Sequence, residues 1–467
     1  MKIALIFPNI NYRHIIKEII SPPLGIAYLA AVLIRRGHDV RVFDAAVKNL
    51  GIEQLKNMVH DFDPAIIGFT TNVATATMAC YTAKVFKKAM PQANIVFGGP
   101  WATIEADTII KRRLADIVVL GEGEETIVQL ASAIENGGEF ESVDGIAFPN
   151  KAGDIIKTKN RPFIQDLDSL PFPAWNLLPN SKHYHYNNRY YPFYPILTSR
   201  GCPFDCIYCT KVVHGYKMRY RSVENVIAEI RFLKERYKIK ELIIADDNFT
   251  QDPERAEQIF DRIYEEKLDI KILFSNGIRS DIYSERLVAK MKRAGVYRVF
   301  LGIESGNQLM VNKIKKGLRL DVVRGFVELL RKYNIEQGGY FMLGLPDDTP
   351  ATMMDTIRFA LQLRIKPHFH KTIAIPGTKL YEQVKDCVQN KGLMFDASFS
   401  KSGATFERYP GQGKDMMRAI KQGYARFFFN PRTIINLISE TRTMQDVFWA
   451  FNSGLRILEM TFGKGTT

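Results

Sequence analysis

Three of the five cysteines in this 467-residue chain lie in residues 198–210, Thr-Ser-Arg-Gly-Cys-Pro-Phe-Asp-Cys-Ile-Tyr-Cys-Thr. They are Cys202, Cys206 and Cys209, with C-x3-C-x2-C spacing. A structural zinc site takes four ligands, whereas three thiolates can hold a 4Fe-4S cluster and leave one iron open. Two other interpretations stay open at this point: free thiols without a metal, and a zinc site that borrows His214. The spacing favours a cluster loop around which the rest of the chain is arranged.

The length of the chain exceeds the size that one hydrophobic core usually reaches, so two domains and an appendage are expected. No apolar stretch is long enough to span a bilayer, and Met1 leads straight into a strand-like run, which predicts a cytoplasmic protein. Cys80 and Cys387 lie far from the trio, which argues against a disulfide framework. The net charge of +14 favours anionic partners but does not choose among nucleic acid, a membrane surface and phosphorylated substrates.

Residues 1–140 alternate short apolar runs with helical patterns, which predicts a parallel, doubly wound α/β sheet covered on both faces. Ligands of such sheets lie beyond the carboxyl ends of the strands, where this chain has loops of small residues. The absence of a G-x-G-x-x-G motif counts against a dinucleotide site, and each glycine considered alone could simply turn a tight loop. The candidate ligand-binding residues of these loops are Thr71, Asn72, Gly98, Gly99, Trp101, Gly121, Gly123 and Glu124.

Residues 141–193 are rich in proline and aromatic residues, which predicts an ordered connector without regular elements. In residues 194–395 six predicted strands alternate with helices, which indicates a partial (β/α)6 barrel with its site at the carboxyl ends of the strands. Polar residues and glycines fall at those ends: Asp246, Asn276, Arg279, Glu304, Gly344 and Gly377.

The cysteine spacing, with Tyr208 before the last cysteine, resembles the cluster loop of radical S-adenosylmethionine (SAM) enzymes. With residues 22–25, 98–102 and 121–124, the chain resembles the cobalamin-binding branch of that family over roughly residues 1–390. The resemblance implies three cofactors: a 4Fe-4S cluster on the three cysteines, SAM on the open iron, and cobalamin on the loops of the first, Rossmann-like domain. It implies SAM contacts from all six strand-end residues and from Tyr208. In this resemblance Tyr208 would contact the adenine and Glu304 would contact the methionine or ribose. The glycines at 344 and 377 would let the backbone approach the cofactor.

Two departures from the family pattern bear on the first domain. An Asp-x-His-x-x-Gly motif is absent, because His14, His38 and His60 lack such neighbours, so we expect no histidine from this domain on the cobalt. Trp101 stands where relatives often have histidine, and its ring would either cover the corrin or fill the core.

Alternatives also remain for the acidic residues of the barrel. Glu304 could form a salt bridge with Arg279 or Arg319 instead of contacting SAM. Asp246 and Asp247 could cap the helix expected near Pro253.

Residues 396–467 form a basic region in which helical apolar stripes at 434–438 and 447–458 follow Phe427, Phe428 and Phe429. Such a tail packs on its own barrel more often than on an anionic membrane, but both interpretations stay open.

The resemblance implies methylation of an unactivated carbon through a 5′-deoxyadenosyl radical and methylcobalamin, with cyclisation, oxidation or rearrangement as alternatives. It also implies a small-molecule or lipid substrate and an electron donor such as flavodoxin or ferredoxin. A nucleic-acid partner is not expected, because residues 211–221 are the only basic stretch with interleaved aromatics, and they directly follow the cysteine loop. The first 200 residues contain only Cys80, which disfavours the methylthiotransferases with a second cluster.

Overall fold

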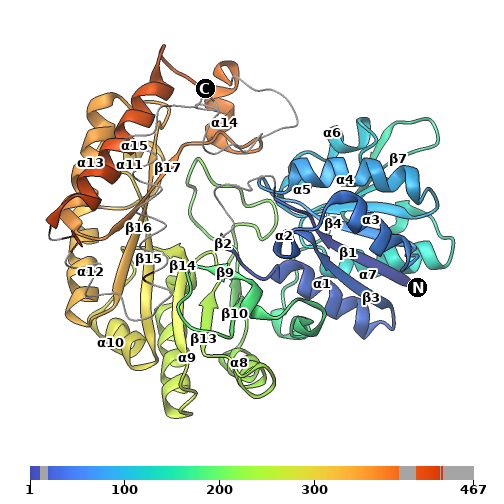
Figure 1. The fold of residues 1–467 in the computed structure, drawn as a ribbon, viewed down its shortest axis with the longest axis horizontal. Coiled ribbons are helices and arrows are strands. Elements are labelled where there is room, and N and C mark those ends of the chain that lie inside the picture. The colour runs from blue at the N-terminus through green and yellow to red at the C-terminus, as the bar shows by residue number, and fades with distance from the viewer. Residues whose placement is uncertain (11–18, 389–405, 432, 435–446, 448–467) are drawn as a thin grey trace.

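The computed structural model describes residues 1–10, 19–388, 406–431, 433–434 and 447. Figure 1 shows two helix-covered sheets with loops of the middle of the chain between them. Both are α/β layers, as the alternating pattern predicts, and the loops between the sheets include the cysteine segment.

The first sheet has the order β3-β1-β4-β5-β6-β7-β8, and its first five strands are parallel. Its strands are almost continuously buried, because helices cover both faces. The strands are β1 (Lys2–Phe7), β3 (Asp39–Asp44), β4 (Ile66–Thr70), β5 (Asn94–Gly98), β6 (Ile117–Val119), β7 (Ile146–Pro149) and β8 (Ile155–Lys157). The helices are α1 (Leu24–Arg35) and α7 (Glu124–Glu135) on one face, α3 (Ile52–His60), α4 (Ala76–Ala89), α5 (Pro100–Ile104) and α6 (Ala106–Lys111) on the other, and short α2 (Ala45–Lys48) after β3.

The predicted connector, residues 141–193, contributes regular structure, so the expectation of none was wrong. Strands β7 and β8 pair antiparallel at the edge of the first sheet. Another short pair joins β2 (Ile19–Ile20) to β9 (His185–Tyr186). These strands have two to four residues each, too few for a recognisable period in the sequence.

The second sheet confirms the six predicted strands, which lie in the order β10-β13-β14-β15-β16-β17, all parallel. Helices cover its outer face, and Ser222, Asp252 and Ser284 cap three of them. The strands are β10 (Phe193–Ile196), β13 (Glu241–Ile244), β14 (Lys271–Ile278), β15 (Val296–Glu304), β16 (Glu336–Leu343) and β17 (Lys366–Lys371). The helices are α8 (Val223–Tyr237), α9 (Pro253–Glu265), α10 (Glu285–Arg293), α11 (Gln308–Lys313), α12 (Leu320–Lys332), α13 (Pro350–Leu363) and α14 (Lys379–Val384).

The described part of the C-terminal region is mainly α15 (Gln412–Phe428), which packs against α13 and β17. A Cβ at Gly423 would lie 2.6 Å from Ile357, so the helix sits close to the barrel. Phe427 is buried in this contact. Most of the two apolar stripes, at 434–438 and 447–458, lies outside the described residues, and membrane contact by the tail stays a prediction. In the described residues, none of the helices combines the length and apolar character needed to cross a bilayer.

Glu241 is the first residue of β13 and lies in a buried polar network at the amino ends of the barrel strands. Its carboxylate accepts hydrogen bonds from the backbone N–H groups of Arg189 and Tyr190, at 2.9 and 2.7 Å, and from the hydroxyl of Tyr297, at 2.9 Å. Burial raises the pKa of Glu241 to about 7, because these hydrogen bonds offset only part of the lost hydration.

Glu336, at the amino end of β16, behaves in the opposite way. It forms ion pairs with Arg189 and Arg298, both at 2.7 Å. Burial alone would raise its pKa, but the charges of Arg298 and Arg189 outweigh burial and hold the pKa below its usual value.

We predict opposite pH dependence for Glu241→Gln and Glu336→Gln. The folded-state pKa of Glu241 is raised, so the stability it contributes is present below about pH 4.5 and is lost as the pH rises to about 7. Glu241→Gln removes that loss. The free energy of unfolding of the variant, measured against the wild type, should therefore be higher at pH 8 than at pH 5 by up to about 3 kcal/mol. The folded-state pKa of Glu336 is lowered, so the stability it contributes is present above about pH 4.5 and is lost at more acidic pH; Glu336→Gln should therefore destabilise more at about pH 7 than at about pH 3. Urea unfolding is the measurement, at pH 5 and 8 for Glu241→Gln and at about pH 3 and 7 for Glu336→Gln; a stability change that does not depend on pH in either variant would contradict the prediction.

Candidate functional site

The cysteine loop, residues 201–218, lies between the short antiparallel strands β11 (Ser199–Arg200) and β12 (Arg219–Tyr220). Backbone hydrogen bonds fix the loop: Cys202 N donates to Gly215 O at 3.3 Å, and Ile207 N donates to Ile314 O at 3.1 Å. Gly201 has φ of +93°, and a Cβ there would lie 2.3 Å from the carbonyl oxygen of Lys217. The glycine before Cys202 is therefore required by the turn itself.

The three thiols of this loop are half-buried and form no disulfide. The Lys211 ammonium donates to the sulfur of Cys209 at 3.0 Å, a contact that stabilises negative charge on sulfur. In the described residues no group of three or more Cys, His, Asp or Glu side chains converges as ligands of one metal ion do. His214, the residue that a zinc site would borrow, instead places Nδ1 3.2 Å from Asp247. This geometry argues against a single zinc ion, whereas a 4Fe-4S cluster takes each thiolate on a separate iron.

Tyr208 and Glu304, both predicted SAM contacts, lie together next to the cysteines. The Tyr208 hydroxyl donates to Glu304 Oε1 at 3.0 Å, and the ammonium of Lys316 lies 2.9 Å from the same oxygen. The alternative for Glu304, a salt bridge with Arg279 or Arg319, is wrong, because these arginines pair with Asp281 and Asp321. Lys316 is a residue that sequence reasoning missed, since it follows α11 and no motif marks it.

The backbone of Glu304 supports a functional role for this residue. Its φ is +70°, a left-handed conformation that is costly for a residue with a Cβ. The register of β15 against β16 also shifts between Gly302 and Glu304, a bulge of the kind that re-aims a side chain. Its carboxylate at the barrel mouth can accept from a ligand hydroxyl or ammonium.

Three other predicted SAM contacts brace the barrel mouth. Asp246 is buried and accepts from Thr198 and Ser199, at 2.5 to 2.7 Å, so its oxygens are already engaged. Burial raises its pKa, and these hydrogen bonds offset burial only in part. The Asn276 amide donates to Ala245 O at 2.6 Å, and the Arg279 guanidinium stacks 3.5 Å from the Phe204 ring of the cysteine loop. The helix at Pro253 is capped by Asp252, so the capping alternative for Asp246 and Asp247 is wrong.

The two glycines at strand ends contact protein rather than open space. Gly344 has φ of +81°, and a Cβ there would lie 2.7 Å from the sulfur of Met416 on α15. A Cβ at Gly377 would meet Ile104 of the first domain at 3.5 Å. Packing explains the glycine at 344, and a φ of +79° explains the glycine at 377, so the role of both toward SAM stays a prediction.

A mostly apolar cavity of about 520 Å³ lies between the carboxyl edge of the first sheet and the cysteine loop. Gly98, Gly99, Gly121, Gly123 and Glu124 line one side of the cavity, and residues 209–215 line another. A Cβ at Gly98 would meet no atom nearer than Val119 at 3.7 Å. A glycine at this position is therefore not needed to relieve a clash, and it keeps the cavity open for a ligand.

The remaining residues predicted to bind cobalamin do not line this cavity. Thr71 is buried and donates to Gly98 O at 2.8 Å, and the Asn72 side chain accepts from the backbone of Ala74 and Thr75. Trp101 is buried in the core of the first domain, the position that the core-filling alternative expects. The ring borders a second, smaller cavity but not the main one.

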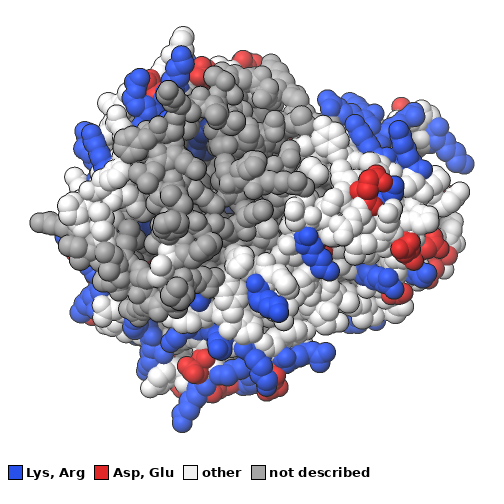
Figure 2. Space-filling view, in the orientation of Figure 1, with Lys and Arg blue, Asp and Glu red and all other residues white. Residues whose placement is uncertain are grey.

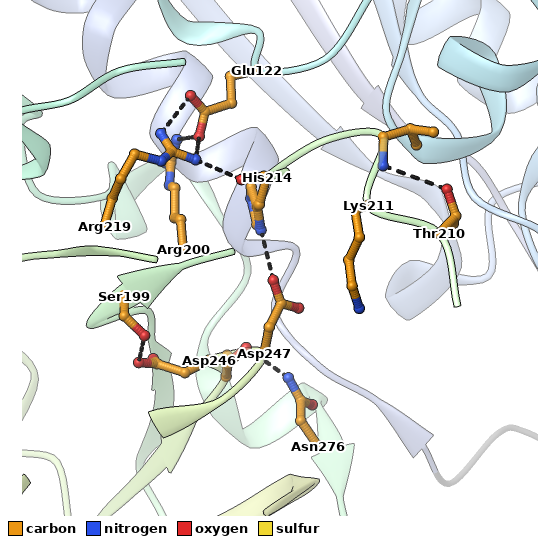
Figure 3. Close-up of polar contacts among 12 residues, drawn as sticks. Glu122, Ser199, Arg200, Thr210, Lys211, His214, Arg219, Asp246, Asp247 and Asn276 are labelled. Carbon is orange, nitrogen blue, oxygen red and sulfur yellow. Dashed lines mark hydrogen bonds and ion pairs between the residues drawn. The ribbon is translucent and has the colours of Figure 1, made fainter. Parts of the chain in front are cut away.

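Glu122, next to the predicted Gly121 and Gly123, joins the two halves of the site (Figure 3). Its carboxylate accepts from Arg200 at 3.0 Å and from both terminal nitrogens of Arg219 at 2.9 Å. Arg200 also pairs with Glu124 at 2.5 Å, so Glu124 is engaged by protein as well as lining the cavity. Burial alone would raise the pKa of Glu122, but the hydrogen bonds from Arg219 and the charge of Arg200 outweigh it and lower the pKa.

The arginines stand immediately before and after the cysteine loop, and Glu122 follows β6 of the first sheet. All four charged side chains of this network are buried. The network therefore fixes the cavity wall relative to the cysteines, a link that the sequence did not reveal because its partners are 76 to 97 residues apart.

We predict that Glu122→Gln loosens the two sheets from each other, because it leaves a buried arginine without its counter-charge. The matched control is Glu229→Gln, which breaks the buried Arg221–Glu229 pair inside the barrel domain. Each variant should lose about 3 kcal/mol of stability. In hydrogen exchange, only Glu122→Gln should expose residues 199–221 and 121–124 together. The same exchange pattern in both variants would contradict a linking role.

Two histidines inside the barrel were missed by sequence reasoning. His368 and His370 on β17 point away from Phe369, which packs under α15. Their rings lie 5.5 and 5.7 Å from the Tyr340 ring, whose hydroxyl donates to Ser275 O. Burial lowers the pKa of the His368 imidazole well below its usual value. The alternation Lys-Pro-His-Phe-His-Lys of β17 was the available signal.

That no histidine of the first domain binds the cobalt stays a prediction. His38 and His60 are not among the described residues that line the cavity, and His14 lies outside the described residues.

Comparisons with known proteins agree with this geometry. Residues 196–360 match the model of the radical SAM superfamily, and residues 18–131 match that of the B12 binding domain. The chain is 32% identical over 448 residues to an "uncharacterized methyltransferase" of Pyrococcus horikoshii, covering 94% of this chain and 95% of the relative. It is 30% identical over 317 residues to the anaerobic magnesium-protoporphyrin IX monomethyl ester cyclase of Synechocystis, covering 67% of this chain and 63% of that enzyme.

Among solved structures, the fold is similar to the radical SAM methyltransferase TsrM of Kitasatospora setae with cobalamin and a 4Fe-4S cluster bound. The TM-score is 0.69 at 17% identity, and the match covers 83% of this chain and 78% of that one.

The chain is a radical SAM enzyme of α/β fold with a cobalamin-binding domain. More specifically, it belongs to the B12-binding radical SAM family, and its cofactors are a 4Fe-4S cluster, SAM and cobalamin. The residues present fit these groups, because three unpaired thiols share one braced loop and that loop borders an apolar cavity at the edge of the first sheet.

Proposed function

We propose that this enzyme methylates an unactivated carbon of a small molecule. The observation that carries the proposal is that residues 209–215 belong to the cysteine loop and also line the cavity assigned to cobalamin. When bound, the cluster and SAM supply a radical that removes a hydrogen atom from a substrate C–H bond, and cobalamin supplies the methyl group that replaces it. A common wall for the two sites favours such a sequence of steps, because the reacting groups are held near one another.

In this proposal Cys202, Cys206 and Cys209 hold the cluster. Tyr208 and Glu304 orient SAM, with Lys316 fixing the Glu304 carboxylate. Gly98, Gly99, Gly121 and Gly123 leave room for the corrinoid. Thr71, Asn72 and Trp101 support the loops that carry these glycines.

We further propose that the substrate enters the barrel above the ring cluster of Tyr340, His368 and His370. The Phe300 and Tyr340 rings stack with centroids 5.3 Å apart and form a flat apolar floor. The side chain of His370 is exposed beside this floor, so its imidazole can meet a polar group of the substrate. A flat molecule with a hydrogen-bonding edge suits this lining.

Ring formation is the second candidate, favoured by the 30% identity with the Synechocystis cyclase. The same radical would serve both reactions, and they differ in whether the product gains a methyl group. Small molecules extracted from the source cells are incubated anaerobically with the reconstituted enzyme and SAM carrying a trideuterated methyl group. Methylation predicts a product that gains the label in place of one hydrogen. A product without label that has lost hydrogen atoms would overturn methylation in favour of cyclisation.

We predict that two variants separate the cofactor sites. Replacing all three loop cysteines with Ala should abolish iron binding, about four irons per chain in the wild type, together with formation of 5′-deoxyadenosine. Gly98→Leu should fill the cavity and weaken corrinoid retention at least about tenfold, while iron content stays unchanged. The matched control is Gly51→Leu, because Gly51 has open space around it. Iron analysis and the corrinoid absorption spectrum are the readouts, and corrinoid retention by Gly98→Leu would contradict the cavity assignment.

A further inference from the structure

The sequence holds no second set of thiolates that could pass electrons to the loop cysteines. Of its five cysteines, three lie in the loop, while Cys80 and Cys387 stand singly on α4 and just after α14. Another Fe-S cluster takes several thiolates, so the chain has none to relay electrons internally. The electron needed by the cluster therefore comes from a redox group outside these residues, and that group has to approach the cysteine loop from the surface.

The cysteine loop has one face open to such an approach. Its inner side, residues 209–215, lines the cavity, whereas Pro203 and Lys217 are exposed and Tyr216 is 53% exposed. These three residues border an open depression of about 800 Å³ on the outer surface. The backbone hydrogen bond from Cys202 N to Gly215 O, at 3.3 Å, ties the residue before Tyr216 directly to the first cysteine.

Lysines surround this outer face, and we name Lys217, Lys313, Lys315 and Lys379 the outer basic rim. Lys379 lies 2.6 Å from Asp205 in the cysteine loop, and Lys315 lies 3.9 Å from the same carboxylate. Lys313 pairs with Asp347 at 2.7 Å. Four lysines against two aspartates leave a net charge of +2. The three paired lysine side chains are 44 to 60% exposed, so their charge reaches an approaching molecule.

The rim is limited on one side. Asp252 and Glu254, at the start of α9, border the depression, whereas the Glu257 carboxylate there is buried and paired with Arg286. An acidic partner is therefore attracted toward the cysteine loop and repelled from α9, which gives it a preferred orientation.

We propose that the outer basic rim is the docking surface for a small acidic protein that carries single electrons. The inference rests on the cofactors of the proposed function and names the partner of that site. In each transfer the donor protein is oxidised by one electron and the cluster is reduced by one, with no bond formed or broken. A weak, charge-steered contact suits this task, because encounters in electron transfer bury little surface and the donor has to leave after each turnover.

The test compares two reductants in the full-length reconstituted enzyme. Reduced flavodoxin, an acidic carrier protein, has to dock, whereas dithionite is small and reaches the cluster without docking. The charge-reversal variant is K217E/K315E/K379E, and a neutral variant with Gln at the same positions guards against misfolding. The matched control is K84E/K88E/K111E, which changes the same amount of charge on exposed lysines of α4 and α6.

We predict that the KM for flavodoxin in 5′-deoxyadenosine formation rises about tenfold in the charge-reversal variant at low salt and less in the Gln variant. At about 0.5 M salt the wild type and the variants should converge, because the charges are screened. The dithionite-driven rate should stay unchanged, and the control variant should behave like the wild type.

Several outcomes would overturn the inference. If the KM for flavodoxin of the charge-reversal variant is unchanged, the docking surface lies elsewhere. If the KM of the control variant rises equally, the effect is explained by the net charge of the protein. Loss of the dithionite-driven rate would show that the lysines hold the cysteine loop instead. The rim would be assigned to a membrane if the wild type co-sediments with anionic phosphatidylserine vesicles and the charge-reversal variant does not, while its KM for flavodoxin is unchanged. If both reductants yield 5′-deoxyadenosine but no methylated product forms, the proposed function fails while the docking result stands.

Discussion

The buried ion pairs between Glu122, Arg200 and Arg219 are the interaction on which the rest of the site depends. Two charges taken out of water gain little net stability even when paired, so such a network is poorly explained as a source of stability alone. Its geometry is the better explanation. Glu122 follows a strand of the first sheet, and the arginines bracket the cysteine loop that leads into the second. Moving either sheet breaks hydrogen bonds to charged groups, so the network holds the cavity wall and the cysteines in one arrangement.

That arrangement explains why small residues and charged residues alternate in the loop after β6. Gly121 and Gly123 line the cavity and leave space, while Glu122 and Glu124 face arginines of the barrel. A loop of four residues thus shapes the ligand cavity and anchors the neighbouring domain. Figure 2 shows that Lys and Arg are distributed widely over the visible face of the molecule, so the net charge of +14 does not by itself single out one surface there.

Much of the fold could be predicted from the sequence, because both sheets consist of buried apolar strands alternating with amphipathic helices. The C-x3-C-x2-C loop was equally visible, since its spacing is local. Partners that come together only in three dimensions were not visible: Lys316 lies beside Glu304, and Arg200 lies beside Glu122. Sequence reasoning placed Asp246 and Gly344 at the ends of the correct strands. It could not show that one is engaged by Thr198 and Ser199 and that the other is packed against α15.

The central claim is that the cavity beside residues 209–215 holds cobalamin close to the cluster. Electron paramagnetic resonance of the anaerobic enzyme tests it most directly, with the cluster reduced and the cobalt in its paramagnetic +2 state. If the corrinoid lies in this cavity, the two unpaired spins are near neighbours, and the spectrum should show broadening or splitting that is absent when either centre alone is paramagnetic. A spectrum equal to the sum of the two separate centres would contradict the account and place the corrinoid elsewhere.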